Sequence, residues 1–202
     1  MCTAKEDQEL CAIVLAGGKS TRMGQDKTRV RVNGRTLVQQ MVDLAGIFCS
    51  KTYVVGQNPE LGSKVKWMLD EIPGIGPMGG IITALKRLHS PCLVLACDLP
   101  RLEESLLSRL IMRRGEKDSH HCLTAFRQER TAYVESLVAV YEIECLDLLL
   151  ASYRRGCYKL SRAIPENRRL HVPYGPEEKS CFFNVNYPDE LEKIISGIHL
   201  NN

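Results

Sequence analysis

Several residues along this chain are suited to chemistry. In chain order they are the cations Arg22 and Lys27, the carboxylates Asp70 and Asp98, and the paired amides Asn184 and Asn186. Cations near backbone N–H groups bind polyphosphates, and a carboxylate can hold Mg²⁺ against phosphate oxygens. The combination indicates a site for a metal-bound polyphosphate.

The two cations follow a short apolar run, Cys11–Ala16, that is typical of a buried strand in a parallel sheet. Gly17–Gly18 ends the run and lets the backbone turn and approach a ligand closely. A Walker A loop would need glycine in place of Ile13, and a dinucleotide fingerprint would need glycine in place of Lys19 and Arg22. The loop is therefore predicted to bind phosphate in another way, and the alternative is a solvated basic loop.

Asp70 and Asp98 each open a loop that follows an apolar segment. The run from Asp70 to Gly80 holds four glycines and two prolines and leads into a helix, which favours close backbone approach to a flat or anionic ligand. The alternative is a plain connection between elements. Asp98 follows the most apolar strand, and ligands bind beyond the carboxyl ends of such strands, so we expect it to hold Mg²⁺. The alternative is that Asp98 caps the next helix.

Asn184 and Asn186 alternate along an extended segment, which places both amides on one face. They could satisfy backbone groups or bind a polar substrate, and their spacing alone does not choose between these roles.

Composition limits the class of protein. The chain has 202 residues, of which 44% are hydrophobic, and a net charge of +3, which is no argument for binding nucleic acid. No apolar run is long enough to span a membrane, and the polar N-terminus, expected to be flexible over residues 1–9, lacks a signal-peptide core, so we expect a cytoplasmic protein. The nine cysteines are dispersed, which favours reduced, buried thiols over zinc or disulfides.

Apolar periodicity predicts elements that alternate between strands and helices. Strands are expected at Cys11–Ala16, Thr52–Val55, Val65–Leu69, Cys92–Ala96, His121–Phe126, Ser136–Tyr141 and Leu170–Val172. Helices are expected from Leu37 to about Phe48, around Ile81 to Leu88, at Glu103–Arg113, Ile143–Tyr153 and Cys157–Ile164, and from Pro188 onward. This order predicts one Rossmann-like α/β domain over residues 1–202, with three layers and helices on both faces of a mostly parallel, twisted sheet.

Four motifs together resemble the MobA family, the molybdenum cofactor guanylyltransferases. They are L-A-G-G-K-S through R-M-G to D-K from Leu15 to Lys27, Asp70 through G-P-M-G-G to Gly80, C-D-L-P from Cys97, and F-N-V-N-Y-P-D-E-L from Phe183. The first motif resembles the wider nucleotidyltransferase superfamily with a GT-A-like fold, and the paired asparagines narrow the resemblance to MobA. The resemblance to the MobA family extends from about Ile13 to Ile195.

The resemblance implies transfer of GMP from GTP to the terminal phosphate of molybdopterin, with Mg²⁺ as cofactor and release of pyrophosphate. It implies that the nucleotide contacts Leu15, Ala16, Gly17, Gly18, Lys27, Asp70 and Asp98, that Asp98 holds the metal, and that Asn184 and Asn186 contact molybdopterin. Arg22, Lys27 and the metal at Asp98 would neutralise charge during transfer. Transient contacts with cofactor-biosynthesis proteins or recipient molybdoenzymes are also implied.

The sequence departs from the family pattern in places and leaves rivals open. Gly56 stands where some members carry asparagine, Tyr187 stands where threonine is usual, and Tyr133-Val134 replaces a histidine-proline or similar pair that some relatives carry. One rival is a cytidylyltransferase acting on molybdopterin or on a sugar-like or isoprenoid phosphate, although such relatives commonly carry Ala-Gly in place of Gly17-Gly18. Another rival is a non-catalytic nucleotide-binding module. Such a module should have lost at least one of Arg22, Lys27 and Asp98, and all three are present.

Overall fold

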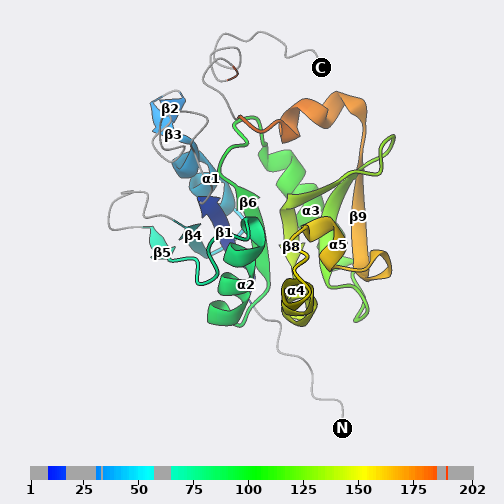
Figure 1. Ribbon diagram of the computed structural model, residues 1–202. Coiled ribbons are helices and arrows are strands. Elements are labelled where there is room, and N and C mark those ends of the chain that lie inside the picture. Colours follow the sequence, from blue (N-terminus) through cyan, green and yellow to red (C-terminus); the bar gives the residue numbers. More distant parts are fainter. Residues whose placement is uncertain (1–8, 17–30, 33, 57–64, 186–189, 191–202) are drawn as a thin grey trace.

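Seven strands form one sheet in the structure, a computed structural model that describes residues 9–16, 31–32, 34–56, 65–185 and 190. They are β1 (Cys11–Ala16), β4 (Lys51–Gly56), β5 (Lys66–Met68), β6 (Cys92–Ala96), β7 (Leu123–Gln128), β8 (Val134–Tyr141) and β9 (Arg169–Tyr174). Their order is β5–β4–β1–β6–β8–β7–β9, as Figure 1 shows. A separate ribbon pairs β2 (Arg31–Val32) with β3 (Arg35–Thr36).

Among the described strands, β8 alone runs against its neighbours in the seven-stranded sheet. It pairs antiparallel with β6 and β7, whereas β1 pairs parallel with β4 and β6, and β7 pairs parallel with β9. All residues of β1 are buried, because an apolar strand inside such a sheet is covered on both faces. The predicted mostly parallel sheet is confirmed.

Helices cover both faces of the sheet, as predicted. They are α1 (Leu37–Gly46), α2 (Pro77–Leu88), α3 (Glu104–Gly115), α4 (Cys145–Arg154) and the short α5 (Leu160–Ala163), with 3₁₀ turns η3 (Glu166–Arg168) and η4 (Pro176–Phe182). Buried side chains of α1 and α3 share one hydrophobic cluster, and those of α2, α4 and α5 share another. The two clusters form the layers on either side of the sheet, which confirms the three-layer, Rossmann-like α/β architecture.

Local signals account for several element boundaries. Thr36 caps α1, since its hydroxyl accepts a hydrogen bond from the Gln39 N–H at 3.1 Å. Strand β8 begins at Val134, earlier than predicted, because a turn closed by the Tyr133 carbonyl and the Gln128 N–H starts its ladder. Turn η4 was not predicted, because one buried aromatic side chain, Phe182, anchors an otherwise polar segment.

Most of the described cysteines are buried, as predicted. None of the eight described cysteines forms a disulfide, and six of them are buried. Within the described ranges, no group of three or more potential metal-ligating side chains is present. None of the described helices has the length and apolarity needed to cross a membrane.

Candidate functional site

The carboxyl ends of β4, β1 and β6 lie side by side at one edge of the sheet. Ala16 pairs with Gly56, Leu15 pairs with Ala96, and the Cys97 N–H donates to the Leu15 carbonyl at 3.3 Å. The predicted phosphate loop leaves β1 between these two strands, at the point where the connecting helices α1 and α2 cover opposite faces. Ligands of open α/β sheets bind at such a switch point.

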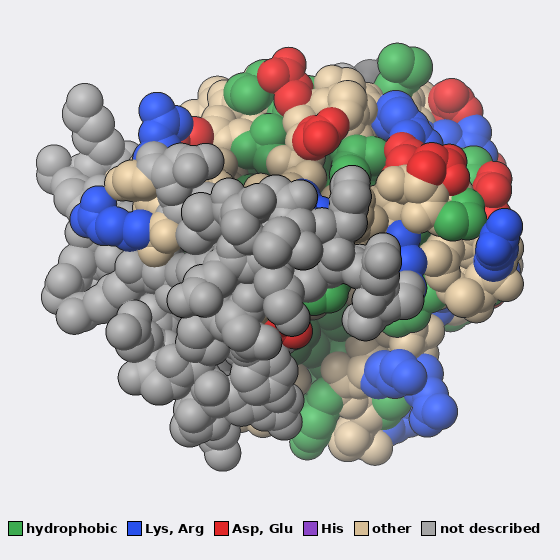
Figure 2. All heavy atoms as spheres, turned by 90° about the horizontal axis from the view of Figure 1, so that it is seen from above, with side chains coloured by type: hydrophobic (Ala, Val, Ile, Leu, Met, Phe, Trp, Pro, Cys, Tyr) green, Lys and Arg blue, Asp and Glu red, His purple; other side chains and the backbone are tan. Residues whose placement is uncertain are grey.

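Of the predicted site residues, five lie outside the described part of the chain: Gly17, Gly18, Arg22, Lys27 and Asn186. Figure 2 shows the carboxyl edge from above, with hydrophobic side chains lining a hollow beside the residues drawn in grey. The predicted roles of these five residues stay predictions.

Leu15 and Ala16 are buried at the end of β1, where helix α2 packs closely against the strand. A Cβ on Gly80 would lie 2.9 Å from Cδ2 of Leu15 and 3.3 Å from Cγ1 of Val55. Gly80 therefore lets the first turn of α2 approach β1 and β4. This contact fixes the N-terminus of α2 beside the start of the predicted phosphate loop.

The Asp70 carboxylate is held at the N-terminus of α2. Its Oδ1 accepts from the Ile72 N–H at 2.8 Å and from the Thr83 hydroxyl at 3.4 Å, and the same hydroxyl accepts from the Glu71 N–H at 3.0 Å. The Thr83 side chain is fully buried. The positive end of the helix dipole also stabilises a carboxylate at this position.

The glycines of this loop serve two different physical needs. Gly74 and Gly76 have φ values of +90° and +71°, a left-handed conformation that favours glycine. A Cβ on Gly79 would clash with the Ile72 carbonyl oxygen and would lie 2.8 Å from each carboxylate oxygen of Asp70. The absence of a side chain at Gly79 is thus explained by close approach to Asp70, and the predicted approach of this loop to a ligand stays a prediction.

Thr83 has a structural role that its sequence context did not reveal, since it is one hydroxyl on an otherwise apolar helix face. We expect Thr83→Val, which removes the hydroxyl but keeps the shape, to lower the free energy of unfolding by about 0.5–1.5 kcal/mol, because the Glu71 N–H and the Asp70 carboxylate each lose a hydrogen bond to the Thr83 hydroxyl. Urea denaturation measures this change. Thr83→Ser keeps the hydroxyl and is the matched control, so equal losses in both variants would contradict the role.

Asp98 follows β6 at the same edge and is half-buried. The residue at the N-cap of α3 is Glu103, so the alternative in which Asp98 caps that helix is wrong. Mg²⁺ is commonly held by one or two carboxylates together with substrate phosphates, so a single carboxylate at this edge of the sheet fits this ion.

Asn184 lies beside Asp98, because the next residue, Val185, donates its N–H to the Asp98 carbonyl at 2.9 Å. Asn184 is exposed, whereas Val185 is fully buried. Phe182 anchors the segment, since its ring lies 4.5 Å from that of Tyr174. The structure thus brings Asp98 and Asn184 together beside the end of β1, and it holds Asp70 separately against α2.

Comparison with known proteins agrees with this arrangement. Residues 12–170 match the model of the MobA-like NTP transferase domain. A protein of Thermococcus gammatolerans named probable molybdenum cofactor guanylyltransferase is 31% identical over 196 residues, which cover 91% of this chain and 98% of that protein. A protein of Pyrococcus furiosus with the same name is 31% identical over 92% of this chain and 96% of its own length.

Solved structures share the fold. Molybdopterin-guanine dinucleotide biosynthesis protein A from Archaeoglobus fulgidus has a TM-score of 0.70 and 24% identity over 92% of this chain and 96% of its own. The 4-diphosphocytidyl-2C-methyl-D-erythritol synthase of Anaerococcus prevotii has a TM-score of 0.67 and 11% identity over 95% and 96%. The sequence resemblance to MobA is confirmed, and this chain is a nucleotidyltransferase that belongs to the MobA-like NTP transferase family.

Proposed function

We propose that this enzyme transfers GMP from GTP to the terminal phosphate of molybdopterin and releases pyrophosphate. The observation that carries the proposal is the hydrogen bond from the Val185 N–H to the Asp98 carbonyl. It joins the predicted metal ligand to the segment that bears Asn184, at the edge where β1 ends. The names of relatives about 30% identical over most of the chain support the same reaction.

The nucleotide side of the site would use groups from three loops. Backbone groups of Leu15, Ala16, Gly17 and Gly18 and the ammonium of Lys27 would hold the triphosphate, with Asp70 and Asp98 completing the nucleotide site. Asp98 would hold Mg²⁺, which when bound neutralises charge on the α-phosphate and on the leaving pyrophosphate. Asn184 and Asn186 would orient the acceptor.

The chemical step needs little acid–base assistance from the protein. A terminal phosphate oxygen of the acceptor forms a bond to the α-phosphorus, and the bond from that phosphorus to the bridging oxygen breaks, so pyrophosphate leaves with the electron pair. The attacking phosphate is already anionic and requires no strong general base. Arg22 and Lys27 would supply positioning and charge neutralisation instead.

The proposed reaction also implies the substrates, the location and the partners of the enzyme. The substrates are small molecules, and the protein would work in the cytoplasm as one nucleotidyltransferase domain over residues 1–202, with transient contacts to proteins that supply or receive the cofactor. A cytidylyltransferase is the second candidate, and the likeness to the Anaerococcus prevotii structure concerns the fold alone. The glycine pair Gly17–Gly18 favours the larger guanine base.

A nucleotide panel tests the choice of base. With Mg²⁺ present, we expect GTP to bind at least about tenfold more tightly than CTP, which corresponds to about 1.4 kcal/mol. Guanine presents N1–H and N2–H donors to a carboxylate or carbonyl, and a mismatched base leaves such acceptors unpaired. Thermal shift with GTP, CTP, ATP and UTP measures the preference, and pyrophosphate release with molybdopterin measures transfer. Equal stabilisation by CTP, or release with CTP alone, would favour the cytidylyl reaction.

A further inference from the structure

The start of β8 carries an acidic residue, Glu135, that the proposed reaction does not yet use. Strand β8 runs antiparallel to β6, and Leu95 pairs with Val138 at the last step of their ladder. Asp98 lies three residues beyond Leu95 on one chain segment, and Glu135 lies three residues before Val138 on the other. Because the two strands run in opposite directions, the two acidic residues lie at the same end of the same ladder, at the carboxyl edge of the sheet.

Tyr174 holds the Glu135 side chain. Its phenol donates a hydrogen bond to Oε1 of Glu135. Strand β7 lies between β8 and β9, and neighbouring strands are about 4.8 Å apart, so the Tyr174 side chain reaches across β7 to make this bond. Burial and the neighbouring carboxylate raise the pKa of Tyr174, which therefore keeps its proton and serves as the donor.

The same tyrosine links Glu135 to the segment that carries Asn184, the residue predicted to contact molybdopterin. The ring of Tyr174 packs against Phe182 at 4.5 Å, and Phe182 lies two residues before Asn184. Val185 then binds the Asp98 carbonyl. Contacts thus run without a break from Glu135 through Tyr174 and Phe182 to the segment that carries Asn184.

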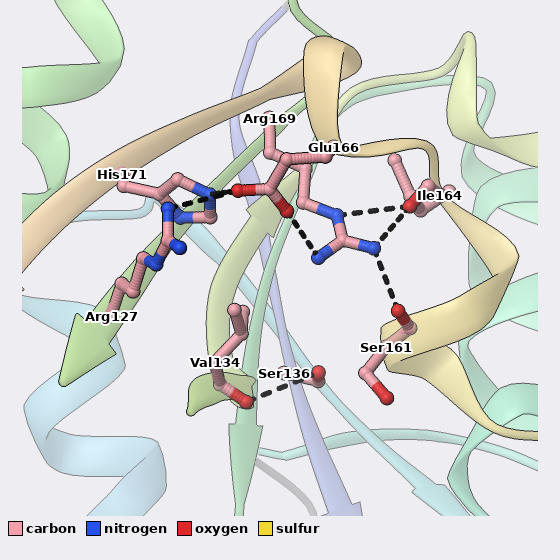
Figure 3. A network of polar contacts seen from close by, with 8 residues as sticks. All are labelled: Arg127, Val134, Ser136, Ser161, Ile164, Glu166, Arg169 and His171. Carbon is pink, nitrogen blue, oxygen red and sulfur yellow. Dashed lines mark hydrogen bonds and ion pairs between the residues drawn. The ribbon is translucent and has the colours of Figure 1, made fainter. Parts of the chain in front are cut away.

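Basic side chains on β7 and β9 are engaged elsewhere. Figure 3 shows Arg127 of β7 and Arg169 and His171 of β9 converging on Glu166, each with an N···O distance of 2.9 Å. Within the described residues, the partner of the Glu135 carboxylate is the Tyr174 phenol. An ionised carboxylate can accept about four hydrogen bonds, so the described residues leave most of the hydrogen-bonding capacity of Glu135 unused.

We infer that Glu135 binds molybdopterin by accepting hydrogen bonds from N–H groups of the pterin ring. This inference rests on the proposed function. The 2-amino-4-oxopyrimidine part of a pterin presents adjacent N–H groups, which match the two oxygens of a carboxylate. The phosphate end of the same molecule is anionic and is repelled by Glu135. Molybdopterin therefore lies with its ring toward Glu135 and its phosphate away from this carboxylate.

Kinetics with two variants and a control test the assignment. Glu135→Gln keeps the size of the side chain but removes the charge and one acceptor, and Tyr174→Phe removes the bond that orients it. Glu129→Gln is the matched control, because Glu129 is exposed at the same edge and its N–H donates to the Tyr174 carbonyl at 3.2 Å. Initial rates are measured with molybdopterin varied at saturating GTP and Mg²⁺, together with the melting temperature.

We expect Glu135→Gln to raise the KM for molybdopterin about tenfold or more, with the KM for GTP unchanged and the control like the wild type. Burial raises the pKa of Glu135, and the bond from Tyr174 lowers it. Tyr174→Phe should therefore raise this pKa further and shift the acidic limb of kcat/KM for molybdopterin to higher pH. Tyr133 and Tyr174 are the titratable groups that act on Glu135 within the described residues.

Three results would overturn the inference: an unchanged KM for molybdopterin in Glu135→Gln, an equal change in Glu129→Gln, or a loss that appears instead in GTP or Mg²⁺ dependence. Wild-type activity separates this inference from the proposed function. A wild type that uses CTP in place of GTP, with the acceptor effect retained, overturns only the proposed base. A wild type that neither binds nor modifies molybdopterin overturns both.

Discussion

Replacement of Asp98 by asparagine should reduce nucleotidyl transfer at least about a hundredfold while the protein stays folded. A direct carboxylate ligand to Mg²⁺ contributes several kcal/mol of charge stabilisation during phosphoryl chemistry, and about 2.7 kcal/mol corresponds to a hundredfold in rate. Asp98→Asn keeps the size of the side chain but removes its charge. The backbone contact to Val185 uses the Asp98 carbonyl, so the substitution leaves it intact.

The rate of pyrophosphate release at limiting and saturating Mg²⁺ measures this effect, and urea denaturation checks the fold. Asp147→Asn is the control, because Asp147 is an exposed carboxylate on α4 whose loss changes the net charge equally. A near-normal rate for Asp98→Asn at limiting Mg²⁺ would remove Asp98 from the metal site.

The parts of the fold that were predictable depend on local sequence. The continuous apolar runs of β1 and β6, the Thr36 cap and the helical spacing of Ile81, Ile82 and Leu85 all act through neighbours in the chain. The position of Asp98 at the sheet edge also followed, because a residue two positions beyond the last residue of a buried strand must lie near its carboxyl end.

The parts that were not predictable depend on contacts between distant residues. Thr83 meets Asp70 across 13 positions, and Tyr174 meets Glu135 across 39, and neither pair has a local pattern. Turn η4 forms because Phe182 enters a cluster with Phe126 and Tyr174. Burial of a single aromatic side chain in such a cluster leaves no periodicity in the sequence.

Gly79→Ala is expected to damage stability and nucleotide binding together. The new Cβ would overlap the Ile72 carbonyl oxygen, which is backbone, and would press on both oxygens of Asp70 at 2.8 Å. Overpacking of this kind costs about 1–3 kcal/mol, and the loop from Asp70 to Gly76 must shift to relieve it. Urea denaturation measures the stability, and calorimetric titration with GTP and Mg²⁺ measures binding. Gly46→Ala is the control, because a Cβ added at this helical glycine in α1 would meet nothing within 4 Å, so alanine should be neutral or stabilising there.

A double-mutant cycle separates the effect of the shifted carboxylate from a general loss of stability. If Gly79→Ala weakens GTP binding by displacing Asp70, then Asp70→Ala alone should weaken it by a similar factor, and the double variant should be little worse than either single one. Residues that act through a shared contact are non-additive by about 0.5–3 kcal/mol, whereas independent sites add. Additive losses would mean that Gly79 affects the nucleotide by a route that does not pass through Asp70, such as the orientation of the first turn of α2. Unchanged GTP affinity in Asp70→Ala would remove Asp70 from the nucleotide site and leave it as the residue that fastens this loop to Thr83.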